Sequence, residues 1–193
     1  HVSKTVSCCF STLRQIRSIR QTVTKPVLQS LVVALVLTRL DYGCATLAGL
    51  PDVQLHRLQA VQNAAARLIF SARKYDHVSP LLQELHWLRV PERIAFRLAT
   101  LAYRAQHNMA PRYLADELLR VADIGARQRL RSATTNNLYI RATRRSTIGD
   151  RAIGIAASRV WNSLPTEIQS STSLAVFRRN LKTELFSRSY AIR

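Results

Sequence analysis

The sequence predicts a mostly α-helical protein, a helical bundle with a basic irregular loop or small β-hairpin insert. Apolar residues recur at three- and four-residue steps in segment after segment, which is the period of a helix buried on one face. Proline, serine and aspartate stand where those segments begin or end. The chain has 193 residues, of which 47% are hydrophobic, so it is long enough and apolar enough to bury a core.

Residues 149–165 show this helical pattern most fully. Gly149 interrupts the preceding segment, Asp150 is expected to cap the first turn, and Pro165 ends the helix. Small residues in the segment would let another helix approach closely. Arg151 and Arg159 fall on the side opposite the apolar stripe, which consists of Ile153, Ala157, Val160, Trp161 and Leu164.

The first half of the chain predicts several helices. One carries Leu13 and Ile16 with an arginine-rich flank, and Pro26 starts a more apolar helix, 27–40, that looks buried on most sides. Asp52 is expected to cap a long helix whose stripe extends to Leu68. A Ser79-Pro80 start then predicts a helix over 81–88, which carries Trp87.

In the second half, Pro91 begins a helix that ends near residues 107–108, and Pro111 restarts a short one. From residue 123 to 147 the pattern changes to arginines among Thr, Asn and Ser, where Asn136-Asn137 is typical of a turn. Ser173 caps a last helix with the stripe Leu174, Phe177, Leu181 and Leu185. Three regions follow: a helical region 1–121, a basic insert 122–148, and a C-terminal helical pair 149–193 that packs on the first region.

The charge is strongly positive. Lys plus Arg number 29 against 11 for Asp plus Glu, which gives a net charge of +18. Such an excess indicates a polyanionic partner, because a solvated surface does not need it. Arginine supplies most of the charge, which suits bidentate contacts to phosphate.

Several classes of site are disfavoured. A two-metal catalytic site needs acidic residues that converge on the ions, whereas the aspartates here are scattered along the chain. The Cys and His residues lack the spacing of zinc ligands. No phosphate-binding glycine loop and no Gly-x-Ser-x-Gly elbow occurs. The three cysteines, an odd count, indicate a reducing intracellular compartment, and no apolar run is long enough to cross a membrane. The start at His1 indicates a fragment, and the acid-free first 40 residues leave a mitochondrial transit peptide as a minor alternative.

Six blocks of the sequence stand in a recognisable order. They are residues 39–51 (Arg-Leu-Asp-Tyr to Gly-Leu-Pro), 58–68, 76–88, 110–114, 149–165 (ending in Val-Trp-Asn-Ser-Leu-Pro) and 177–186. Taken in order, these blocks resemble the region that follows the catalytic core in reverse transcriptases of non-LTR (LINE-type) retrotransposons of the CR1, L2 and jockey kind. The chain departs from the family pattern at Gly43, Ile153 and Ser158. The catalytic aspartates of the family lie in a block upstream of His1.

The resemblance implies a thumb and post-thumb region of a transposable element's RNA-directed DNA polymerase, which is not an enzyme on its own. Its implied partners are RNA and DNA, as template-primer duplex and target DNA, and the upstream polymerase core. No cofactor is expected in this fragment, Mg²⁺ belongs to the parent polymerase, and the nucleus is the implied location of that parent. A thumb grips the nucleic-acid backbone, so the expected contacts are cations to phosphates.

The residues expected to bind nucleic acid are therefore arginines, and the large apolar residues are assigned to packing. The structural anchors are Trp87, Trp161, Leu164 and Phe177. The nucleic-acid-binding set is Arg14, Arg17, Arg20, Arg127, Arg129, Arg131, Arg141, Arg144, Arg145, Arg151 and Arg159.

Two alternatives stay open. One is a helical protein-interaction scaffold that docks its apolar stripes on the polymerase core, with the positive charge serving solubility. The other is a non-functional relic of a decayed element.

Overall fold

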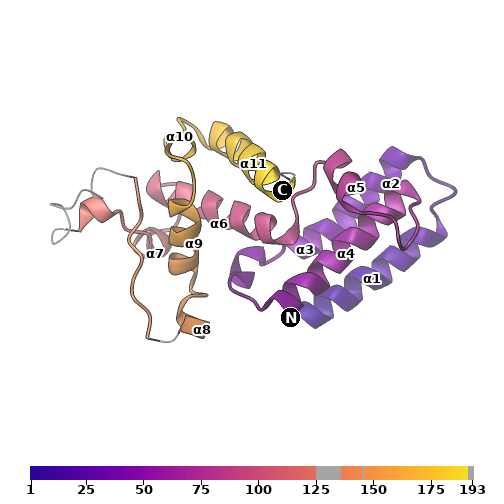
Figure 1. Ribbon diagram of the computed structural model, residues 1–193, viewed down its shortest axis with the longest axis horizontal. Helices are drawn as coiled ribbons and strands as arrows, with labels where there is room; N and C mark the ends of the chain where they lie inside the picture. The colour runs from indigo at the N-terminus through magenta and orange to yellow at the C-terminus, as the bar shows by residue number, and fades with distance from the viewer. Residues whose placement is uncertain (125–135, 145, 191–193) are drawn as a thin grey trace. The chain divides into compact units, whose positions relative to one another are not determined.

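The computed structural model describes residues 1–124, 136–144 and 146–190, and it confirms a mostly α-helical chain. Among these described residues, β structure is confined to one isolated antiparallel bridge between Arg120 and Leu138. The chain forms two compact units (Figure 1). Unit 1 comprises His1–Cys44, Leu50–Arg93 and Phe186–Arg193, and unit 2 comprises Ala45–Gly49 and Ile94–Leu185. The three regions expected from composition divide the chain differently and stay a prediction.

Unit 1 is a small helical bundle. Its helices alternate with short turns, and the long helix α6 starts in this unit and continues into unit 2. The elements are α1 (Val2–Ser18), α2 (Lys25–Val32), a π-helical turn (Val33–Leu37), α3 (Thr38–Asp41), α4 (Asp52–Phe70), α5 (Ser79–Glu84) and α6 (Val90–Gln106).

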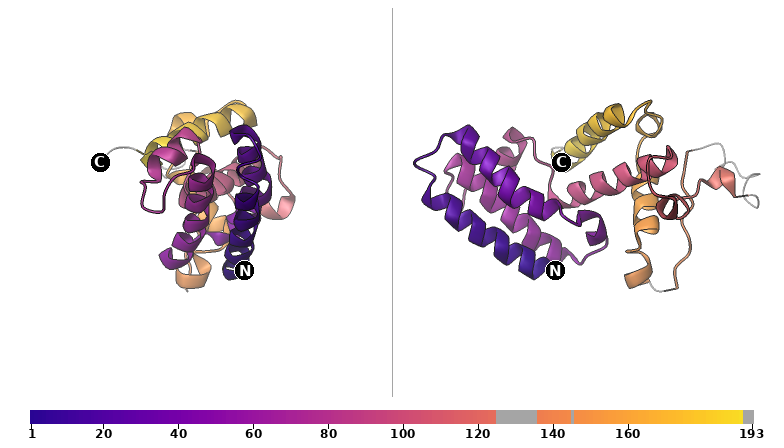
Figure 2. Two further views of the ribbon diagram at one scale, coloured as in Figure 1. Left: turned by 90° about the vertical axis from the view of Figure 1, so that its right-hand side faces the viewer. Right: turned by 180° about the vertical axis from the view of Figure 1, so that it is seen from behind.

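Helices α1, α2 and α4 lie side by side in this unit (Figures 1 and 2). The Arg57 guanidinium donates to Ser3 Oγ at 3.1 Å near the beginnings of α1 and α4, so these two helices run in the same direction. The Cys9 thiol lies 4.0 Å from the Val36 carbonyl oxygen, which joins α1 to the returning chain. Burial also raises the pKa of Cys9. The bundle core contains Leu13, Ile16, Leu28, Val32, Val61, Ala65 and Ile69.

The helix expected over 27–40 forms as α2, the π-helical turn and α3, but the expectation that it is buried on most sides is wrong. Val27, Val33 and Leu35 are 48%, 39% and 42% exposed. Only one side of this apolar segment faces α1 and α4, where Leu28, Val32 and Val36 are buried. Because α2 packs mainly on α1 and α4, no further helix of the described residues covers its opposite side.

The connection from α4 to α6 is fixed by amide side chains. Gln62 is fully buried and its Nε2 donates to the Leu88 carbonyl oxygen at 2.7 Å, while the Val90 N–H donates to Gln59 Oε1 at 2.9 Å. The helix predicted over 81–88 ends earlier, at Glu84, and His86 has a positive φ of 52°. Asp52 lies in the first turn of α4 but makes no side-chain cap there, which corrects the predicted capping role.

Unit 2 holds the rest of the chain. It contains the second part of α6, then several short helical segments, and most of the final helix. The further elements are α7 (Arg112–Ala115), a 3-10 turn (Val121–Asp123), α8 (Ser146–Gly149), α9 (Ile153–Asn162), α10 (Thr166–Gln169) and α11 (Leu174–Tyr190).

Three aromatic rings form the centre of unit 2. The ring of Phe177 stacks on Tyr103 with centroids 4.4 Å apart and lies 5.8 Å from Trp161. The Tyr103 hydroxyl donates to the Ser171 carbonyl oxygen at 2.9 Å, so its polar end is satisfied inside the core. The predicted stripe of α11 is largely confirmed, because Phe177, Leu181 and Leu185 are all buried. The Ser173 hydroxyl accepts the Val176 N–H at 3.3 Å, as a cap does.

The beginning of the helix predicted from residue 149 differs from expectation. Gly149 ends α8, the new helix α9 starts only at Ile153, and Asp150 makes no cap. The Asp150 carboxylate instead accepts a hydrogen bond from Thr143 Oγ1 at 2.8 Å and pairs with Arg159 at 3.0 Å. These tertiary partners compete successfully with the local backbone for the carboxylate.

The end of the basic insert is held by α9. The Asn162 side chain bonds both main-chain groups of Leu138, accepting its N–H at 2.8 Å and donating to its carbonyl oxygen at 2.9 Å. The Trp161 indole N–H donates to the Asn136 carbonyl oxygen at 2.7 Å. The small Gly154 lets Glu117 come close, since a Cβ at that position would lie 3.1 Å from a Glu117 carboxylate oxygen.

Candidate functional site

Two helices of unit 1 carry cations near their C-terminal ends. On α1, Phe10 is followed at helical steps by Arg14 and Arg17, and on α4, Ala64 is followed by Arg67, with Ser71 directly after the helix. Because α1 and α4 run in the same direction and pack together, their basic C-terminal ends lie at the same end of the bundle.

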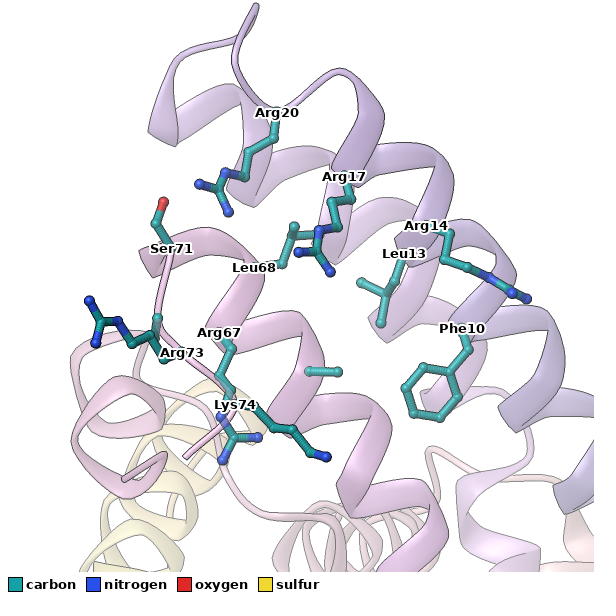
Figure 3. Close-up of a pocket in the computed structure, with 12 residues that line it drawn as sticks. Phe10, Leu13, Arg14, Arg17, Arg20, Arg67, Leu68, Ser71, Arg73 and Lys74 are labelled. Atoms are coloured by element: carbon teal, nitrogen blue, oxygen red, sulfur yellow. The ribbon is translucent and has the colours of Figure 1, made fainter. Parts of the chain in front are cut away.

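A pocket of about 660 Å³ lies between these faces (Figure 3). Arg17 and Arg20 extend from the α1 side toward the end of α4, whereas Arg14 points away (Figure 3). No acidic residue is among the side chains that line the pocket. The cations that line it are Arg14, Arg17, Arg20, Arg67, Arg73 and Lys74, and together they are named the basic pocket.

The positive charge of the basic pocket exceeds what the surrounding backbone can neutralise. Each helix C-terminus carries roughly half a negative charge, and both α1 and α4 end here. The nearby Asp76 carboxylate accepts the Arg73 main-chain N–H at 2.6 Å. With six cations lining the pocket, roughly four positive charges remain after these contributions.

Arg67 at the end of α4 has incomplete hydrogen bonding. Its Nη2 donates to the Asp76 carbonyl oxygen at 3.1 Å, but its Nε is buried and has no acceptor within the described part of the chain. A buried donor without an acceptor is destabilising.

The basic pocket brings together three of the arginines that the sequence predicts to bind nucleic acid, Arg14, Arg17 and Arg20. The other described members of the set lie in unit 2. Arg127, Arg129, Arg131 and Arg145 fall outside the described residues.

Three of the four described arginines of the predicted set in unit 2 lie near an acid or a turn. Arg141 lies 3.6 Å from Glu117, and Arg159 pairs with Asp150. The side chain of Arg151 covers the turn at Gly49, where a Cβ would lie 2.7 Å from its Cγ. Arg144 is exposed. None of these four arginines lines the basic pocket.

The pKa of Asp150 is lowered by its partners. Hydrogen bonds from Thr143 and then from Arg159 hold it below its ordinary value. The carboxylate is therefore charged at neutral pH, and it offsets the positive charge of Arg159.

The predicted anchor residues are all buried. Trp161, Leu164 and Phe177 lie in unit 2, and Trp87 lies in unit 1. The Trp87 carbonyl oxygen accepts a hydrogen bond from the Tyr190 hydroxyl at 2.7 Å, and burial raises the pKa of that hydroxyl.

Sequence reasoning missed half of the basic pocket. Arg67, Arg73 and Lys74 line the pocket but are not in the predicted nucleic-acid-binding set. The two segments that line the pocket are both basic, but no local pattern in the sequence connects one with the other. The pairing of α1 with α4 was the missing information.

Two other kinds of site are absent from the described residues. No group of three or more His, Cys, Asp and Glu side chains there is arranged to hold a metal ion. No helix in that part of the chain is long and apolar enough to cross a bilayer. Comparison of the chain with protein-family models, with curated proteins and with solved structures found no match.

Proposed function

We propose that this chain is the non-catalytic, nucleic-acid-binding C-terminal part of a retrotransposon reverse transcriptase, and that it grips the backbone of the template-primer. The observation that carries the proposal is the basic pocket, which is lined by six cations and by no acidic residue. The ordered blocks that resemble non-LTR elements supply the polymerase context.

The chemistry of the pocket suits a backbone rather than a base sequence. Arginine and lysine bind phosphate oxygens whatever the base, and such contacts position a strand without reading it. A net charge of +18 adds long-range attraction to any nucleic acid. Catalysis and its Mg²⁺ belong to the upstream part of the parent polymerase, in this proposal, and the nucleus is the site of its action.

The test is a titration of a labelled RNA–DNA hybrid with the 193-residue chain at two salt concentrations. If about 6 phosphates are neutralised, the affinity falls roughly a thousandfold between 50 and 200 mM salt. Weak binding that does not change with salt would contradict the proposal.

A second candidate function is a scaffold that docks on the polymerase core. It is favoured by an apolar hollow of about 400 Å³ on α2 and the π-helical turn, lined by Pro26, Val27, Ser30, Leu31, Ala34 and Leu35. Gel filtration of the chain with a polymerase core, before and after nuclease treatment, separates the two functions. Co-elution that survives nuclease supports the scaffold.

A further inference from the structure

We infer that the basic pocket takes a single-stranded nucleic acid, with one unpaired base stacked against Phe10 and neighbouring phosphates held by the cations. This inference rests on the proposed function and goes further, because it names the form of nucleic acid and an aromatic contact.

Phe10 is the apolar wall of the pocket. Its side chain is half-buried and lines the cavity together with Leu13 and Leu68 (Figure 3). It stacks on no other aromatic ring within the described residues. An aromatic ring beside a line of arginines is the combination that single-strand binding proteins use, since every base has a face that can stack.

A duplex can use only part of this arrangement. Its bases are paired and stacked inside, so it offers phosphates to the cations but no free base to Phe10. An unpaired base can leave the strand and enter the pocket. The volume of about 660 Å³ lies within the range of roughly 300–1,000 Å³ typical of pockets that hold small organic groups.

The number of cations favours a strand over a single small anion. Each phosphate of a strand carries one negative charge, so roughly four uncompensated positive charges match several consecutive phosphates. Favourable interaction with the helix C-termini explains only two of the six cations of the basic pocket. Arg17 and Arg67 lie in the last turns of α1 and α4. The other four lie outside those turns, where the effect of a helix end has faded.

The primary test changes the ligand and leaves the protein intact. Fluorescence anisotropy compares a labelled single-stranded oligonucleotide with a fully abasic strand of the same length, which keeps every phosphate. Removal of a stacked base is expected to weaken binding roughly 5- to 150-fold. Equal affinity for the two strands would overturn the inference.

The two proposals fail in different ways. If both strands bind equally tightly and with strong salt dependence, the backbone grip stands and the stacking is refuted. If neither strand nor the RNA–DNA hybrid binds, both proposals fail.

Protein variants assign the effect to Phe10. Phe10→Leu is expected to lose the preference for the base-containing strand, whereas Phe10→Trp is expected to keep it. The matched control is Phe96→Leu, because Phe96 is also half-buried on a long helix and also lies near an arginine, with Arg178 5.9 Å from its ring centroid. A full preference retained by a folded Phe10→Leu protein would overturn the assignment.

Discussion

Neutralising part of the basic pocket should change how binding depends on salt. Replacing Arg17, Arg73 and Lys74 by glutamine removes half of its six cations, and all three side chains are exposed, so the fold should tolerate the change. The matched control replaces three exposed cations of unit 2 that do not line the pocket, namely Arg112, Arg179 and Lys182. Each triple variant lowers the net charge from +18 by three.

The expected magnitude follows from the number of phosphates neutralised. If each of the six cations engages one phosphate of a single strand, log affinity falls against log salt with a slope of about −4. That slope corresponds to a loss of roughly 300-fold between 50 and 200 mM salt. With three cations left, the slope becomes about −2 and the loss about 20-fold.

The assay is anisotropy of a labelled single-stranded oligonucleotide at four or more salt concentrations, with circular dichroism to verify folding. The control variant is expected to keep the wild-type slope. If the two triple variants show the same slope, the positive charge acts over the whole surface, and the basic pocket is not the binding site.

Two further predictions concern unit 2. Phe177→Ala should lower the free energy of unfolding by about 3–5 kcal/mol in urea titrations, because the fully buried ring stacks on Tyr103; a loss below about 1 kcal/mol would show that the ring contributes little. The lowered pKa of Asp150 means that its stabilisation is complete above the ordinary aspartate pKa and is lost as the pH falls through the lowered value. Asp150→Asn should therefore lower the melting temperature at neutral pH, and its difference from wild type should shrink in acid; a constant difference would contradict this cause.

The helical periodicity of apolar residues predicts those helices whose formation depends mainly on their own sequence. The stripe of α11 was readable because Phe177, Leu181 and Leu185 recur at helical steps, and any apolar neighbour satisfies such a stripe. The role of Asp150 was not readable. The Asp150 carboxylate caps a helix only if it bonds to the backbone N–H groups there and not to other partners. Thr143 and Arg159 become such partners only when the chain has folded.

The apolar segment after Pro26 illustrates the same limit. Its composition indicates burial, yet Val27 and Leu35 remain exposed because the number of neighbouring helices is a property of the whole fold. Composition states how much apolar surface exists. It does not state how many sides of a helix are covered.

The candidate site was half predictable for the same reason. Arg14, Arg17 and Arg20 belong to one basic flank that is visible in the sequence, but Arg67 and Lys74 join them only because α4 packs beside α1 in the same direction. A contact between segments about 50 residues apart leaves no local signal.

The π-helical turn over Val33–Leu37 contains one residue that could be deleted without moving the buried side chains of this helix away from the core. The Thr38 N–H donates to the Val33 carbonyl oxygen, five residues back, so this turn holds one residue more than an α-helical turn. At about 100° per residue, a regular helix of the same length would spread Leu28, Val36 and Leu40 over about 120° of its surface. With one residue fewer in the turn, the three would share an arc of about 40°. Loss of a residue here would therefore keep the buried stripe in register, whereas the same loss elsewhere in the helix would rotate it out of the core.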